Sequence, residues 1–267
     1  MPTIQSLLHE TPHELRLETE LLMAEAMNWS RSKVLAFSET EISEKLLPAL
    51  SSKLDRLNRG EPFAYITGSR EFYGLDFEVT PDVLIPRPDT ELLVDLALSR
   101  CAPDARVVDL GTGSGAIAVS LAHERADLAV TASDVSDAAL DVARRNAARH
   151  GCTIKCVASH WFESLNKEFD VIVSNPPYVR RNDPHLQGLA YEPSSALIAG
   201  DDGLADIRII AAEAKNKLAA GGALLIEHGY DQAAEVAELF KQHGFVNVAL
   251  YKDLADQPRV TSGDRPE

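Results

Sequence analysis

Four consecutive residues, Asn175-Pro176-Pro177-Tyr178, have the polar groups and the stiffness needed to hold a planar NH2 group. An asparagine side-chain oxygen and the carbonyl of the next proline can accept both N–H bonds, and an aromatic ring can pack on the plane. Each proline fixes its own φ and restricts the residue before it. The pattern favours methylation of an amide or amino nitrogen by positioning. The competing interpretation is a proline-rich turn that closes a strand, because short motifs also occur by chance.

A second candidate site is the glycine-rich stretch 109–116, which follows an apolar run and precedes a helical pattern at 117–123. Glycines in this context let the backbone approach a ligand at the start of a helix. The glycine spacing also fits a dinucleotide-binding loop, but Asp109 would repel a pyrophosphate and attract the ammonium and sulfonium groups of S-adenosylmethionine. We therefore predict a methyl-donor site at Asp109, Gly111, Thr112, Gly113, Ser114 and Gly115.

Two further residues, one at the end of each of the next two strands, extend this predicted donor site. Asp134 ends the second apolar strand, where a carboxylate can accept hydrogen bonds from both ribose hydroxyls. Its alternative role is a solvated acidic cap before the helix that begins near Ser136. Trp161 follows the third strand and can pack on the adenine, although a lone tryptophan is more often a core residue. Successive strand ends of one sheet are where open α/β folds bind ligands.

The elements that must position these residues fall into three parts. Up to residue 62 the apolar residues recur at helical spacing, as in Leu46, Leu50 and Leu54, which predicts an amino-terminal helical domain. From 63 to 85, aromatic and β-branched residues cluster around glycines and predict a β-hairpin linker. In the helical part, Ser30 is a predicted helix cap, and the Ser-x-x-Glu pattern at 38–41 predicts a capping box before another helix.

Residues 86–267 alternate short apolar strands with helical stretches, which predicts an α/β fold with a mostly parallel sheet covered on both faces. Two further strand-like pieces follow one another with no helix between them and predict an antiparallel edge. The seven predicted strands are 106–110, 128–133, 153–157, 170–173, 223–227, 246–251 and 259–261.

The composition argues against a nucleic-acid-binding protein, a membrane protein and a protein held together by disulfides or metal ions. The chain has 26 Lys and Arg against 41 Asp and Glu, a formal net charge of -15, which opposes unaided binding to nucleic acid phosphates. No apolar run approaches the roughly 18 residues of a membrane span, and the amino terminus lacks a signal-peptide profile, so we expect a cytoplasmic protein with no membrane partner. Cys101, Cys152 and Cys156 are loosely placed, which predicts reduced thiols and no metal site.

Over nearly its whole length the chain resembles the class I S-adenosylmethionine methyltransferases, and closely the peptide chain release factor glutamine N(5)-methyltransferase family (PrmC/HemK). The resemblance rests on the 175–178 motif and on more specific stretches before and after it. These are the linker residues Pro62, Tyr65, Ile66, Gly68, Phe72, Gly74 and Phe77, the segment Ile85-Pro86-Arg87-Pro88-Asp89-Thr90-Glu91, and Glu192-Pro193, Ala196-Leu197 and Gly203-Leu204.

The resemblance implies a Rossmann-like class I methyltransferase fold with a seven-stranded sheet. It further implies methyl transfer from S-adenosylmethionine to the side-chain amide of the glutamine in the Gly-Gly-Gln loop of release factors, which are then the protein partner. Asn175, Pro176 and Tyr178 would be catalytic, Asn175 to Tyr178 would bind the glutamine, and Asn175 would also contact the cofactor. His160 departs from the family pattern, which usually has Asp here. A histidine accepts a hydrogen bond from the adenine amine only through an unprotonated nitrogen.

Other functions and roles stay open at this point. An exocyclic amine of DNA or RNA, adenine N6 or cytosine N4, fits the same clamp, but it predicts a basic recognition surface that residues 1–62 lack. A non-catalytic adaptor that binds release factors is the third hypothesis, and the intact clamp argues against it. The polar segment 179–203 is either a cover over the acceptor peptide or a disordered excursion. The helical domain either recognises the partner or only stabilises the catalytic domain.

Overall fold

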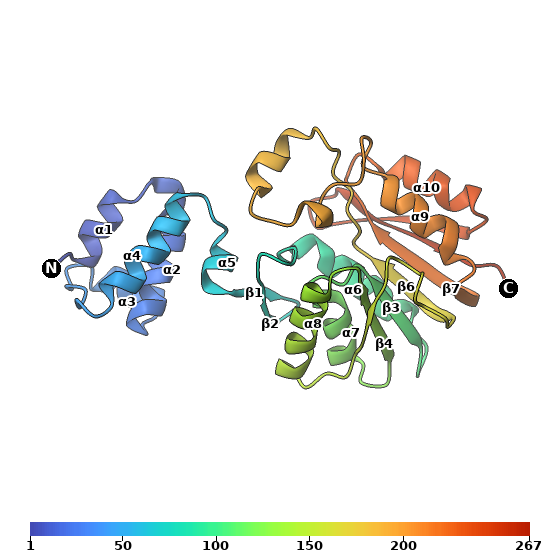
Figure 1. Cartoon of the computed structure of the whole chain (residues 1–267), viewed down its shortest axis with the longest axis horizontal. Helices are drawn as coiled ribbons and strands as arrows, with labels where there is room; N and C mark the ends of the chain where they lie inside the picture. Colours follow the sequence, from blue (N-terminus) through green and yellow to red (C-terminus); the bar gives the residue numbers. More distant parts are fainter. The chain divides into compact units, whose positions relative to one another are not determined.

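The computed structural model describes all 267 residues, and the chain divides into two compact units, Met1–Gly68 and Ser69–Glu267 (Figure 1). The first unit is helical, as predicted, and its core is built from side chains such as Leu22, Met23 and Leu50. Its elements are α1 (Ile4–Glu10), η1 (His13–Leu15), α2 (Arg16–Met27), α3 (Arg31–Ala36), α4 (Leu47–Asn58) and α5 (Phe63–Thr67).

One of the two predicted helix caps in this unit is confirmed and the other is wrong. Ser30 caps α3, because its Oγ accepts the N–H of Lys33 at 3.2 Å. The capping box at 38–41 does not form, and the next helix begins only at Leu47. Instead Glu41 pairs with Thr3 in an isolated antiparallel bridge. Pairing with the amino-terminal segment therefore prevails over the local helix signal.

A two-stranded antiparallel hairpin, β1 (Ser69–Phe72) and β2 (Leu75–Glu78), opens the second unit. The hairpin is shorter than the sequence suggested, because residues 63–67 form helix α5. Pro62 precedes that helix, and Gly68 ends it in the left-handed conformation at φ 73°. The predicted linker, residues 63–85, thus contains a helix followed by a hairpin.

Seven strands form a single sheet in the order β5-β4-β3-β6-β7-β9-β8. The first five are parallel, and β9 runs antiparallel to both β7 and β8. The predicted parallel sheet with an antiparallel edge is therefore confirmed. The strands are β3 (Arg106–Leu110), β4 (Ala129–Asp134), β5 (Lys155–Ala158), β6 (Phe169–Ser174), β7 (Leu218–Glu227), β8 (Val246–Lys252) and β9 (Pro258–Asp264).

Helices cover both faces of this sheet (Figure 1). Helices α6 (Glu91–Arg100), α7 (Ala116–Glu124) and α8 (Asp137–Arg149) share one core layer with Val171 and Val173 of β6. Helices α9 (Ala205–Ala214) and α10 (Ala233–Gln242) share the other with Ile172. Alternate residues of one strand thus enter opposite layers, which is why residues 171–173 are all apolar. No helix combines the length and the apolar character needed to cross a lipid bilayer.

Candidate functional site

The predicted donor and acceptor residues follow neighbouring strands. In the parallel pair β3 and β6, Leu110 lies opposite Ser174, so that Gly111 and Asn175 begin adjacent loops at the carboxyl edge of the sheet. The Ser174 hydroxyl donates to the Leu110 carbonyl at 2.8 Å and locks this register. Strand β4 pairs on the other side of β3 and ends at Asp134. The fold therefore gathers the predicted residues at one edge.

The glycine loop is held to β4 by backbone hydrogen bonds. The N–H groups of Gly111 and Thr112 both donate to the Ser133 carbonyl, at 2.8 and 2.9 Å. The N–H of Gly113 donates to Asp134 Oδ2 at 2.9 Å. Because the protein itself satisfies these groups, the loop has its shape before a ligand binds, which lowers the entropic cost of binding.

Asp134 connects this loop to the start of α8. Its Oδ1 accepts the N–H of Ser136 at 2.9 Å, while Ser136 itself caps α8 by accepting the N–H of Ala139. Burial raises the pKa of Asp134, and the N–H bonds from Ser136 and Gly113 oppose that rise. Asp134 is therefore not the helix cap. Its two oxygens retain lone pairs that can accept from hydroxyl groups, as the predicted ribose contact requires.

Asp109 is a fully buried carboxyl group in β3. Its Oδ2 accepts the Thr112 hydroxyl at 2.6 Å, while Oδ1 has no hydrogen-bond partner. Desolvation raises the pKa of Asp109 to about 7, and the bond from Thr112 opposes this rise. The backbone N–H of Ala118 also lowers the pKa of this carboxyl group. A buried carboxylate is costly unless cations or donors compensate its charge. This arrangement fits the ammonium group of S-adenosylmethionine and disfavours a pyrophosphate.

Gly115 starts α7 where the helix packs on α8. Its φ is +82°, and a Cβ at this position would lie 3.0 Å from Ala143 Cβ and 3.1 Å from Ala143 Cα. Gly113 has φ +54° and open space around it, so it makes a matched control.

We expect Gly115→Ala to lower the free energy of unfolding by about 2–4 kcal/mol, from left-handed strain plus overpacking. Gly113→Ala should cost only about 1 kcal/mol, from strain alone. Urea unfolding of both variants measures the difference. Equal losses in the two variants would contradict the packing role of Gly115.

Trp161 lies beside the glycine loop. Its ring atoms come within 3.6 Å of the position that a Cβ on Gly111 would occupy, and its own φ is 45°. The side chain is partly buried against the α9 and α10 core layer, so it serves packing and also borders the predicted donor site. The indole Nε1 of Trp161 is buried without a hydrogen-bond partner, and burial raises the pKa of the nearby Asp206. The neighbouring His160 is exposed, with Nδ1 3.5 Å from Glu163 Oε1.

Both polar side chains of the clamp contact residues that the motif does not contain. Asn175 Nδ2 donates to Thr90 Oγ1 at 3.1 Å, and the Tyr178 hydroxyl lies 3.4 Å from Glu227 Oε1. The side-chain amide of Gln232 donates to the Tyr178 carbonyl at 3.1 Å. Sequence reasoning did not predict roles for Thr90, Glu227 and Gln232. The one available signal was that Thr90 belongs to the 85–91 stretch of the resemblance.

Glu227 ends β7 and is buried. Desolvation raises its pKa to about 7, and a side-chain hydrogen bond from Thr90, the charge of Arg259 and the Tyr178 hydroxyl oppose that rise. Burial likewise raises the pKa of Tyr178, so the phenol keeps its proton at neutral pH. The clamp thus packs against a buried carboxyl group.

The chain that follows the clamp returns to the 85–91 stretch. Glu192 is buried, and its Oε2 accepts the N–H of Ile85 at 3.0 Å. Its Oε1 accepts from Arg87 Nη2 at 2.5 Å. Two parts of the chain that carry the resemblance are therefore in direct contact, although they lie 105 positions apart.

The base of the 179–203 segment is closed by backbone pairing. Val179 donates to the Leu197 carbonyl at 2.8 Å and accepts from the N–H of Ala199 at 3.0 Å. Between these ends the segment forms two 3-10 helices, η3 (Pro184–Leu189) and η4 (Ser194–Ala196). The segment therefore has regular local structure and a fixed base.

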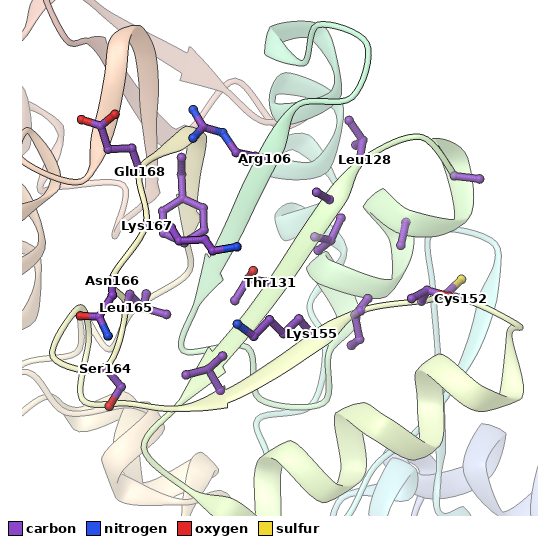
Figure 2. Close-up of a pocket in the computed structure, with 18 of the residues that line it drawn as sticks. Arg106, Leu128, Thr131, Cys152, Lys155, Ser164, Leu165, Asn166, Lys167 and Glu168 are labelled. Carbon is purple, nitrogen blue, oxygen red and sulfur yellow. The ribbon is translucent and has the colours of Figure 1, made fainter.

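A cavity of about 530 Å³ lies elsewhere in the second unit, along β4 and β5 (Figure 2). Its lining includes Thr131, Lys155 and Lys167, but none of the residues predicted to bind the donor or the acceptor. The cavity and the predicted binding site thus lie in different parts of the unit, because the predicted site consists of loops along the strand ends.

Two family models match the chain. The PrmC N-terminal domain matches residues 3–68, and the Methyltransferase small domain matches residues 88–189. Among solved structures, a methyltransferase from Pyrococcus furiosus has a TM-score of 0.58 at 20% identity, covering 81% of this chain and all of that one. At this identity the likeness shows the fold.

Two curated relatives match almost end to end. The release factor glutamine methyltransferase of Burkholderia pseudomallei is 46% identical, over 99% of this chain and 96% of its own length. The protein of the same name from Escherichia coli is 43% identical, over 93% of this chain and 91% of its own length. Identity at this level over both units shows that the chain belongs to the release factor glutamine methyltransferase family.

Proposed function

We propose that this protein transfers a methyl group from S-adenosylmethionine to the side-chain amide nitrogen of the glutamine in the Gly-Gly-Gln motif of peptide chain release factors. The observation that supports this most directly is the orientation of the Asn175 side chain, whose NH2 group donates a hydrogen bond to Thr90. Its Oδ1 is then available, with the Pro176 carbonyl, to accept both N–H bonds of a glutamine amide. The names of the full-length relatives support the same substrate.

An amide nitrogen is a poor nucleophile because its lone pair is delocalised into the carbonyl, so positioning must contribute most. When bound, S-adenosylmethionine would supply a methyl group on a positively charged sulfur, and the amide nitrogen loses one of its two protons after the transfer. Asn175 Oδ1 and the Pro176 carbonyl hold the two N–H bonds, and Tyr178 packs on the amide plane. Pro177 keeps the turn rigid. Good alignment alone supplies up to about 10 kcal/mol.

The donor half of the proposed site uses the other strand ends. Asp109 would pair with the ammonium group through Oδ1, which is buried and has no hydrogen-bond partner, and Asp134 would hold the ribose hydroxyls. The backbone from Gly111 to Gly115 would line the methionine portion, with Trp161 beside the adenine. Asn175 would contact the donor as well as the acceptor, because it begins the loop next to Gly111.

Labelled S-adenosylmethionine tests this function in one experiment with three acceptors. The first is a release factor, the second is the same factor with Gln→Ala in its Gly-Gly-Gln loop, and the third is duplex or single-stranded nucleic acid. We expect label on the first acceptor only. Label on nucleic acid would support the exocyclic-amine alternative. Cofactor binding without transfer to any acceptor would support the adaptor alternative.

We also propose that the helical unit, residues 1–68, contacts the release factor, and that the protein acts in the cytoplasm, where translation ends. The unit exposes Leu35 and Phe37, which are 43% and 57% accessible, and the Phe37 ring packs edge-on against Trp29. Exposed apolar side chains that lie close together are typical of interaction surfaces.

Replacing both Leu35 and Phe37 with Ser should raise the KM for the release factor by about tenfold, since removing an apolar anchor costs about 1–2 kcal/mol. The Kd for S-adenosylmethionine should not change. Exposed Leu254 in the second unit offers a control, as Leu254→Ser should leave both constants unaltered. A KM that is the same for all three proteins would argue that the helices only stabilise the catalytic domain.

A further inference from the structure

A pair of buried polar side chains lies behind the clamp. Glu227, at the end of β7, is 1% exposed, and Thr90, at the end of the 3-10 helix η2 (Pro88–Thr90), is 5% exposed. Asn175 contacts Thr90 and Tyr178 contacts Glu227, at 3.1 and 3.4 Å. The polar ends of both clamp side chains therefore meet the same buried pair.

The direction of the hydrogen bonds follows from the chemistry of the carboxyl group. An ionised carboxylate only accepts, so the Tyr178 hydroxyl donates to Glu227 Oε1 at 3.4 Å. The Thr90 hydroxyl lowers the pKa of the same carboxyl group, which is the effect of a hydroxyl that points its hydrogen at a carboxylate. The positive charge of Arg259 favours this ionised form. A hydroxyl has a single hydrogen, so Thr90 Oγ1 can then only accept from Asn175. The atom that faces Thr90 Oγ1 must therefore carry a hydrogen, so Asn175 turns Nδ2, and not Oδ1, toward Thr90.

We propose that Glu227 and Thr90 are positioning residues that orient the Asn175 amide so that it presents Oδ1 to the acceptor nitrogen. The inference rests on the proposed function, because it concerns how the clamp distinguishes one acceptor from another. With the amide reversed, Asn175 would point its NH2 group at the NH2 group of the glutamine, and two donors would face each other. The observed orientation instead disfavours a carboxyl acceptor, whose oxygens would face Oδ1 and the Pro176 carbonyl.

Thr90→Val tests the proposal, because valine keeps the shape of threonine without the hydroxyl. At pH 8, where Glu227 is ionised, we expect kcat to fall by about tenfold or more, with the Kd for S-adenosylmethionine unchanged. Thr90→Ser restores the hydroxyl and should recover most of kcat. Thr19 in α2 of the helical unit is buried as well, at 1% exposure, so Thr19→Val is the matched control and should leave kcat unaltered.

Glu227→Gln adds a second, independent variant. A neutral amide can donate as well as accept, so the direction of the Thr90 bond is no longer imposed and kcat should again fall. Native kcat in Thr90→Val would overturn the proposal. Equal losses in Thr90→Val and Thr90→Ser would also overturn it, because the effect would then come from the methyl group.

Nuclear magnetic resonance of the Asn175 side-chain NH2 group gives a readout that does not depend on turnover. In the wild-type protein we expect one N–H to be protected from exchange through its bond to Thr90. Rapid exchange of both protons would overturn the proposal, and this measurement decides the matter if Thr90→Val does not fold. If the wild-type protein methylates no release factor, the proposed function fails, while the resonance still tests the orientation of Asn175.

Discussion

Asn175→Ala is expected to lower kcat by about 100- to 1,000-fold, the range seen when one preorganised hydrogen-bonding group is removed from an active site. The variant removes Oδ1, one of the two acceptors proposed for the glutamine amide, and frees the acceptor to rotate. The cofactor loop keeps its bonds to Ser133 and Asp134, so affinity for S-adenosylmethionine should fall far less than kcat, by no more than the contact that Asn175 itself makes with the donor. Single-turnover kinetics with labelled donor, together with calorimetric titration of the donor, separates the two effects.

Asn166→Ala provides the matched control for this loss. Asn166 is an exposed asparagine in the loop before β6 and borders the cavity of Figure 2, away from the predicted site. Its replacement should leave kcat and donor affinity at wild-type values. Near-native turnover of Asn175→Ala, with donor binding intact, would show that the clamp does not hold the acceptor.

The second large effect is expected at Asp109, where Asp109→Asn should weaken S-adenosylmethionine binding by about 10- to 100-fold at pH 8. The variant removes the buried charge proposed to pair with the ammonium group, and loss of such a partner costs about 2–5 kcal/mol, partly offset here by the relief of burying a charge. Below pH 7 the wild-type carboxyl becomes protonated, so its donor affinity should fall by up to about tenfold per pH unit. Titrations from pH 5.5 to 8 measure both effects.

Although Asp109→Asn should bind the donor more weakly, its free energy of unfolding should be higher than that of the wild-type protein at pH 8. The pKa of Asp109 is raised from 3.8 to about 7 in the folded protein, so from about pH 4 to pH 7 the folded state holds a proton that the unfolded chain has lost. The charged form is therefore disfavoured by folding, and this cost is complete above pH 7. Asp109→Asn should unfold at higher urea concentration than the wild-type protein at pH 8, and no longer so at pH 4. A variant that is less stable at both pH values would contradict the buried-charge assignment.

The sheet was predictable because its signals are local. Strands buried on both faces are mostly apolar, and β3 and β6 therefore stand out in the sequence near the predicted boundaries. The glycine loop and the proline-rich clamp are equally local, since backbone freedom at Gly115 and rigidity at Pro176 depend on single residue types. The largest error in a strand boundary is at β7, which begins at Leu218, five residues before the predicted start.

What the sequence could not predict depends on contacts between distant positions. Thr90 and Asn175 lie 85 positions apart, and Tyr178 and Glu227 lie 49 apart, so neither pair leaves a periodic trace in the sequence. The failed capping box at 38–41 has the same cause, because Glu41 pairs with Thr3 near the amino terminus. Local chemistry therefore revealed the donor loop and the clamp, and only the fold revealed what orients them.

The pairing of Val179 with Ile198 has a consequence for how this family can diversify. A closed base separates the residues between them from the clamp, so that insertions there need not alter the position of Asn175. Doubling the length of a flexible loop costs only about 0.6 kcal/mol in closure entropy. The part of this segment before the buried Glu192, which contacts Ile85 and Arg87, can therefore change in length and sequence over evolution and adapt to acceptor proteins of different shape, while the chemical machinery stays constant.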